Sequence, residues 1–209
     1  MISLQRSLGR PAFFFGSLAE SAQLGHQAAV ALHRQLSRRD EAPDLTGVAE
    51  ARRSGKAVIN AVREGLVKHF ITPMEREDLE AVAQGLYAIP KVMEKCAERH
   101  ELSWERLRDM DFSVVARLLV PATEVVVAMA EALGNRATLA EIKAHEARLS
   151  QIEDDASHIV LESMKQLYGP GRDPLTIIIA SEILEILQSA FEHCGALGST
   201  MTRVLMKNS

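Results

Sequence analysis

Residues 70–79 read Phe-Ile-Thr-Pro-Met-Glu-Arg-Glu-Asp-Leu and lie between two long stretches in which apolar residues recur at helical spacing. Thr72 is a residue type that caps helix N-termini, and Pro73 suits the first helical position. Glu75, three residues after Thr72, completes the sequence pattern of a capping box. We therefore expect a helix to begin at this stretch, with Thr72 as its N-cap.

Helical spacing continues from this stretch through almost the whole chain. Thr138 and Glu141 form a second capping-box pattern, and Asp173 followed by Pro174 is a third start signal. We expect a short helix at 103–109 and six long helices at about residues 14–36, 45–70, 73–99, 111–134, 138–167 and 174–207.

Two prolines and two apolar runs make further local predictions. Pro90 and Pro121 fall inside expected helices, where a missing backbone hydrogen bond bends the helix. The run Ile-Ile-Ile-Ala at 177–180 is apolar on every side, so we expect it to be buried. The three phenylalanines at 13–15 are expected to fill the end of a helix bundle; contact with a membrane surface or a partner is the alternative.

The composition indicates a helical protein with no bulk affinity for nucleic acid. The 209 residues are 47% apolar, 25% charged and 4% aromatic, and the net charge is −4. Few aromatic residues favour helices over a β-sandwich or barrel, and the negative charge excludes a strongly basic nucleic-acid binder. Cys96 and Cys194 form no CxxC pair, so we expect free thiols in a reducing compartment. No uninterrupted apolar run approaches the length of a membrane span.

Two segments suggest an internal repeat. Residues 64–70 and 162–168 each end a helix with an aromatic residue and are each followed by a proline-marked helix start. The separation of the two segments along the sequence is close to half the chain length, and this favours a duplicated three-helix unit. We expect one domain over residues 1–209, with halves at roughly 1–100 and 101–209.

The stretch at 70–79 resembles the F-x-T-P-[IV]-[DE]-R-x-D-[LI] signature of PhoU-like proteins. More narrowly, it is similar to the uncharacterised, PhoU-related family often encoded beside Pit-type phosphate transporters. The resemblance covers nearly the whole chain, including the acidic stretch at 153–157 and the final helix. It implies an all-α, elongated bundle of two three-helix halves, with six long helices plus a short one.

The resemblance also implies a function. It indicates a non-enzymatic accessory or regulatory protein of inorganic phosphate transport that acts by protein–protein contact. Its expected partner is a phosphate transporter or signalling protein at the membrane. We further expect a homo-oligomer that is cytoplasmic or peripheral to the inner face of the membrane and does not bind nucleic acid.

Many PhoU-like relatives hold metal ions with carboxylates at positions i and i+4 on facing helices, and this chain departs from that pattern. The four matching positions in the first half are Arg52, Lys56, Tyr87 and Lys91, and those in the second half are Glu153, Ser157, Gln188 and Glu192. Cations repel a divalent ion, so no metal is expected in the first half. Glu153 and Glu192 remain as candidate metal ligands. We expect no cofactor, or at most a divalent or iron ion in the second half.

Other interpretations stay open. Arg52 and Lys56 either replace the lost metal by bridging helices to neighbouring acids or binding an anion, or are solvated helix charges. A ferritin-like metal protein would use Asp155, His158, Glu162 and Glu192, although a second i, i+3 carboxylate–histidine motif is missing from the sequence. A plain oligomeric scaffold is a third function class. No motif marks a catalytic nucleophile.

Overall fold

The computed structural model describes residues 4–38, 40–135 and 137–207, with side chains from Pro11 onward. Within these ranges the chain is helical and contains no strand. The helices are α1 (Leu4–Ser37), α2 (Thr46–Lys68), α3 (Arg76–Leu107), α4 (Ser113–Ala116), α5 (Leu119–Gly134), α6 (Leu139–Leu167) and α7 (Pro174–Lys207). The expected all-α fold, with six long helices plus a short one, is confirmed for the described residues.

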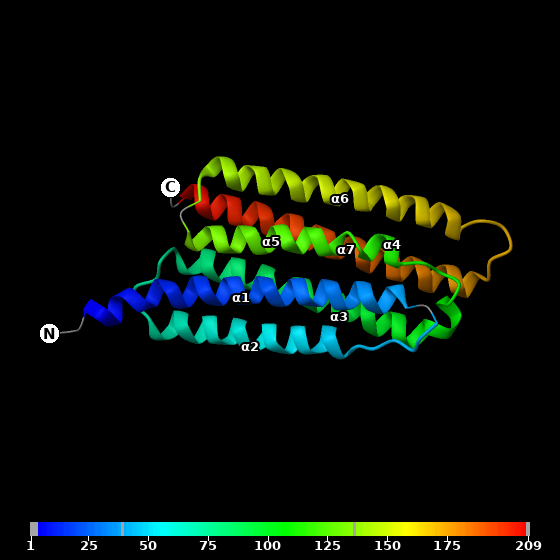
Figure 1. The fold of residues 1–209 in the computed structure, drawn as a ribbon, viewed down its shortest axis with the longest axis horizontal. Coiled ribbons are helices and arrows are strands. Elements are labelled where there is room, and N and C mark those ends of the chain that lie inside the picture. Colours follow the sequence, from blue (N-terminus) through cyan, green and yellow to red (C-terminus); the bar gives the residue numbers. More distant parts are fainter. Residues whose placement is uncertain (1–3, 39, 136, 208–209) are drawn as a thin grey trace.

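The long helices run side by side and form an elongated bundle (Figure 1). α1 packs against α2, α3 and α5, while α7 packs against α3, α5 and α6. One end of the bundle carries the start of α1, the α2–α3 connection and the end of α7, and we call it the α2–α3 end. The opposite end carries the α6–α7 connection and is called the α6–α7 end. Helices of both predicted halves thus share one core, while the division at residue 100 remains a prediction.

The core is formed by the apolar stripes of α1, α3, α5 and α7. Phe14, Leu18 and Leu32 of α1 are fully buried, and so is most of the inward face of α7. Phe14 therefore fills the bundle end as expected, whereas Phe13 is 39% exposed. Cys96 and Cys194 are free and buried, and burial raises the pKa of each thiol to about 12.

Two of the three predicted helix starts are confirmed. The Thr138 hydroxyl accepts the backbone N–H of Glu141, and the Glu141 carboxylate accepts the N–H of Thr138. Asp173 accepts the N–H and the hydroxyl of Thr176 at 3.0 and 2.9 Å. These bonds, followed by a weaker effect of Arg106, lower the pKa of the Asp173 carboxyl.

The third predicted start, with Thr72 as N-cap, is wrong. α3 begins at Arg76 and its N-cap residue, Glu75, makes no side-chain capping bond. The Thr72 hydroxyl instead donates to the Met74 carbonyl at 2.7 Å, within the turn that precedes the helix. Because α3 begins at Arg76, Glu75 cannot be the third helical residue of a capping box, and its carboxylate pairs with a lysine from the end of α7.

Three other local predictions need correction. α3 continues to Leu107, so the short helix lies at 113–116 and not at 103–109. Pro121 is the third residue of α5, where a backbone N–H has no intrahelical acceptor, so it lies outside the helix interior. Ile178 is 65% exposed, which contradicts the expected burial of 177–180.

Two segments, Ser113–Gly134 and Pro174–Lys207, are long and apolar enough to cross a membrane by length and composition. The sequence analysis considered uninterrupted apolar runs and expected no span, whereas the mean hydropathy of a whole segment can be high even when a few charged residues interrupt it. Both segments pack into the bundle, and core helices pass the same test. They are weak evidence for insertion in a bilayer.

Candidate functional site

The seam between α6 and α7 brings together the four second-half positions that the sequence resemblance marked as candidate metal-ligand positions. In this chain two of them are uncharged and bind each other. Gln188 of α7 donates from Nε2 to the Ser157 hydroxyl of α6 at 2.9 Å. A hydrogen bond across the helices thus occupies the place of two carboxylates, and it needs no ion to hold it.

The other two positions, Glu153 and Glu192, keep their carboxylates and lie near each other. Burial raises the pKa of the Glu153 carboxyl, and the negative charges of Glu192 and Asp154 raise it further. Glu153 reaches α7 at Gly195, where a Cβ atom would collide with the carboxylate oxygen Oε2. Gly195 therefore provides the space that the Glu153 carboxylate fills.

The corresponding seam of the first half, between α2 and α3, is held by opposite charges. Arg52 Nε lies 2.7 Å from Glu94 Oε2, and both side chains are mostly buried. Burial raises the pKa of the Glu94 carboxyl, an effect that the nearby Arg52 opposes. Arg52 thus bridges two helices, as one of the two interpretations expected. Lys56 is exposed, in agreement with the other interpretation, and Lys91 is exposed as well.

These donor sets do not fit a multinuclear metal cluster. The first seam presents a guanidinium and two ammonium groups, which repel cations. The second seam offers two carboxylates, fewer than the six or more oxygen ligands that a hard cation prefers. Among the described residues, no three His, Cys, Asp or Glu side chains converge in a way that could hold a metal ion.

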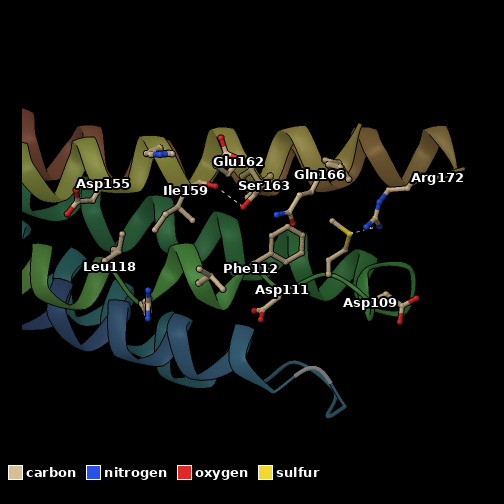
Figure 2. Close-up of a pocket in the computed structure, with 16 residues that line it drawn as sticks. Asp109, Asp111, Phe112, Leu118, Asp155, Ile159, Glu162, Ser163, Gln166 and Arg172 are labelled. Carbon is tan, nitrogen blue, oxygen red and sulfur yellow. Dashed lines mark hydrogen bonds between the residues drawn. The ribbon is translucent and has the colours of Figure 1, made fainter. Parts of the chain in front are cut away.

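A pocket of about 660 Å³ lies between α6 and the segment 109–118 (Figure 2). Asp155, His158 and Glu162, three residues of the ferritin-like alternative, line it, but Glu192 does not. Asp155 accepts a bond from Gln151 at 2.9 Å. Glu162 lies 2.6 Å from Lys165, which lowers its pKa. Both carboxylates therefore have partners on their own helix, and nothing favours the ferritin-like reading.

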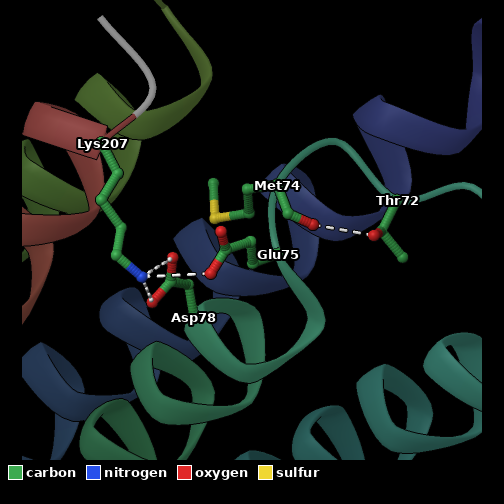
Figure 3. A network of polar contacts seen from close by, with 5 residues as sticks. All are labelled: Thr72, Met74, Glu75, Asp78 and Lys207. Carbon is green, nitrogen blue, oxygen red and sulfur yellow. Dashed lines mark hydrogen bonds and ion pairs between the residues drawn. The ribbon is translucent and has the colours of Figure 1, made fainter.

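The signature at 70–79 forms a second cluster, at the α2–α3 end (Figure 3). Asp78 is 5% exposed, and Lys207 donates to its two carboxylate oxygens at 3.3 and 3.2 Å. The same ammonium reaches Glu75 Oε2 at 3.1 Å. These hydrogen bonds raise the pKa of Lys207. The acidic residues of the signature thus fasten the end of α7 to the start of α3.

Sequence reasoning missed the partners in both seams and in the signature. The sequence does not indicate that Glu94 is the partner of Arg52, because the two residues meet only in the particular antiparallel register of α2 against α3. Lys207 is 129 residues from Asp78, so no local pattern connects them. The signal that could have found Lys207 is the helix order, which places the end of α7 beside the start of α3.

Comparison with known proteins agrees with this architecture. No family model matches the sequence. The UPF0111 protein YkaA of Bacillus subtilis (strain 168) is 23% identical over 151 residues, which span 72% of this chain and 73% of YkaA. A crystal structure of a PhoU-like protein from Shewanella oneidensis MR-1 superposes with a TM-score of 0.82 at 15% identity, covering 92% of this chain and 99% of the other.

A second crystal structure from Shewanella oneidensis MR-1, described as a PhoU-like phosphate regulatory protein, gives a TM-score of 0.81 at 15% identity. It covers 93% of this chain and 99% of its own. Both superpositions extend over nearly the full length, as the resemblance in the sequence implied. The narrower, Pit-associated branch stays a prediction. The chain therefore has the PhoU-like fold, an elongated all-α bundle whose inter-helix seams here carry an ion pair and a hydrogen bond in place of carboxylate clusters.

Proposed function

We propose that this chain is a non-enzymatic accessory or regulator of inorganic phosphate transport that acts by contact with another protein. The observation that carries the proposal is the full-length match to PhoU-like folds, one of them in a protein described as phosphate regulatory. Fold alone does not assign function, so the charge pattern of the seams matters as well. The first seam carries the Arg52–Glu94 ion pair and the second the Gln188–Ser157 hydrogen bond, and neither donor set fits a multinuclear metal cluster, so we propose that the outer helix faces make the contact.

The partner that we propose is a phosphate transporter or a signalling protein at the cytoplasmic side of the membrane. The chain would work there as a cytoplasmic or peripheral protein, as a homo-oligomer and without nucleic acid. Co-purification from membranes of the source organism tests this: the tagged chain, cross-linked in intact cells, should recover a phosphate-transport or phosphate-signalling protein. Recovery of no such protein under phosphate-rich and phosphate-poor growth would contradict the proposal.

We also propose that the chain acts without a metal cluster in its first half. Glu153 and Glu192 stay the candidate ligands for at most one divalent or iron ion, with water completing the coordination. Metal analysis of protein purified without chelators should find less than about one tightly held ion per chain. A multinuclear cluster in stoichiometric amount would overturn this part of the proposal. Loss of the ion from an E153Q/E192Q variant would locate a single site.

A further inference from the structure

The middle of the α2–α3 seam carries positive charge that no carboxylate balances. At one limit of this stretch Arg52 pairs with Glu94 at 2.7 Å. At the other limit Arg63 pairs with Glu80 at 3.7 Å. Between these two ion pairs neither helix contains an Asp or Glu. The stretch contains three cations, which we call the basic seam: Arg53, Lys56 and Lys91.

The cations of the basic seam are exposed, and two of them flank a close approach of the helices. A Cβ atom at Gly55 would lie 3.7 Å from Tyr87 and 3.8 Å from Pro90. Lys56 follows Gly55 and Lys91 follows Pro90, so the two lysines lie on either side of this approach. None of the three cations is within ion-pair distance of a carboxylate among the described residues.

The α6–α7 seam has the opposite charge. Residues 149–164 of α6 contain four acids and no Lys or Arg, and residues 174–202 of α7 contain three acids and no Lys or Arg. Glu185 and Glu192 share the face of α7 that carries Gln188, because they lie three and four residues from it.

The acids on this side of the bundle are called the acidic seam: Glu153, Asp154, Glu185 and Glu192. The last three are exposed, and Glu153 is half-buried. In the part of the chain that the structure describes, none of the four is within ion-pair distance of a Lys or Arg. The chain therefore presents one unbalanced surface of each sign.

The two surfaces lie on opposite long edges of the bundle. Figure 1 shows α2 along one edge and α6 along the other. α2 packs against α1 and α3, whereas α6 packs against α5 and α7. α2 contains five Lys or Arg and two Glu, a net charge of +3, and α6 contains three Lys or Arg and six acids, a net charge of −3. These opposite charges cannot meet within one chain, but they match when one chain lies beside another.

We propose that the basic seam of one copy binds the acidic seam of a second copy. The contact is heterologous, because each copy contributes a different surface. A bound pair then still presents one basic and one acidic seam to solvent, so association continues past the dimer. The proposed contact rests on the homo-oligomer of the proposed function and names its surfaces.

Sedimentation velocity of the full chain tests the contact, with chelator present so that no metal ion bridges two acidic seams. The average mass should rise with protein concentration and fall when NaCl is raised from about 50 mM to about 500 mM, because salt screens exposed charges. K56E/K91E should lower the association constant by about tenfold or more, since it places like charges opposite each other.

The matched control is R34E/R117E, which changes the net charge by the same amount. Arg34 and Arg117 are exposed arginines outside both seams, and neither is in an ion pair among the described residues. This control should associate like the wild type. Equal losses in R34E/R117E and K56E/K91E would show that overall charge, and not the basic seam, governs association.

A mixing experiment separates loss of the contact from loss of the fold. D154K/E185K reverses two charges of the acidic seam and leaves Glu153 and Glu192 in place. Alone, it should associate about tenfold or more weakly than the wild type, as K56E/K91E does. An equimolar mixture of the two variants should associate again, because the unaltered basic seam of D154K/E185K meets the unaltered acidic seam of K56E/K91E.

Three results would overturn the proposed contact. A wild type that stays monomeric at low salt over the whole concentration range would exclude self-association. Oligomers that neither salt nor K56E/K91E weakens would place the contact elsewhere. A mixture that fails to recover association would show that the two seams do not bind each other. Each result is separate from the co-purification test of the phosphate role, which uses a different partner and a different readout.

Discussion

Replacing Ser157 and Gln188 with glutamate in one chain tests the interpretation of the α6–α7 seam. The double variant S157E/Q188E restores carboxylates at all four positions, next to Glu153 and Glu192. Without metal it should lose the 2.9 Å hydrogen bond and gain repulsion between facing negative charges. With a divalent ion it should acquire a ligand set that the wild type does not have.

The size of the effect follows from the geometry. Loss of the Gln188–Ser157 bond costs about 1 kcal/mol. Two carboxylates brought to ~4 Å repel by about 1 kcal/mol in bulk water and about 4 kcal/mol near a protein surface. Because the seam is partly exposed, the total loss of unfolding free energy should lie at about 2–5 kcal/mol in chelator. A metal present at a hundredfold excess over its Kd returns about 2.7 kcal/mol.

Urea denaturation of the wild type and the variant, with chelator and with Mn²⁺, measures the loss of unfolding free energy without metal and its recovery with metal. We expect the variant to be destabilised in chelator and to recover in Mn²⁺, whereas the wild type should change little. S157A/Q188L is the control, because it removes the hydrogen bond without adding charge and should lose about 1 kcal/mol with no metal response. Equal stabilisation of the wild type and S157E/Q188E by Mn²⁺ would refute the reasoning.

Three further predictions concern titratable groups whose pKa is raised or lowered by burial. Burial lowers the pKa of His100, so this histidine binds a proton at a higher pH in the unfolded chain than in the folded one. The free energy of unfolding should therefore fall as the pH drops below about 6.5, by at most about 1.4 kcal/mol per pH unit. Urea denaturation of H100L should lack this pH dependence, whereas H193L, a control at an exposed histidine, should keep it. Burial and neighbouring acids raise the pKa of Glu153, so E153Q should raise the melting temperature at pH 7, and the gain should vanish near pH 4; a gain that persists there would point to packing as its cause. Cys96 and Cys194 are buried thiols with a pKa of about 12, so both should resist a thiol reagent in the folded protein and react once it is denatured; rapid reaction of the native chain would contradict their burial.

The sequence predicted those parts of the fold that depend on neighbours along the chain. The caps at Thr138 and Asp173 formed because donor and acceptor lie three residues apart. The similar pattern at Thr72 did not form, because the helix begins at Arg76 and Glu75 is its N-cap residue, paired with Lys207 from across the bundle. α3 ran on through Ser103, whose hydroxyl bonds the carbonyl of Arg99 and leaves the helix intact. Local rules were therefore confirmed at two of the three predicted helix starts and failed at residues 103–109.

The candidate site was predicted in position more than in chemistry. The resemblance placed Ser157 and Gln188 on facing helices, but only the structure reveals that they bind each other. The bridge from Arg52 was one of two interpretations, and its partner Glu94 could not be chosen without the register of α2 against α3. The exposure of Phe70 was not predicted, since hydrophobic patterning gives no reason for an apolar residue of a signature to face solvent.

Uptake of radiolabelled phosphate by cells is the most direct measurement of the central claim, that this chain regulates phosphate transport by contact and not by chemistry at a metal cluster. Deletion of the gene should change the uptake rate or its response to phosphate supply. Wild type and E153Q/E192Q should both restore normal uptake when expressed from a plasmid. Unchanged uptake in the deletion strain would contradict the transport role, and restoration by the wild type but not by E153Q/E192Q would contradict action by contact alone.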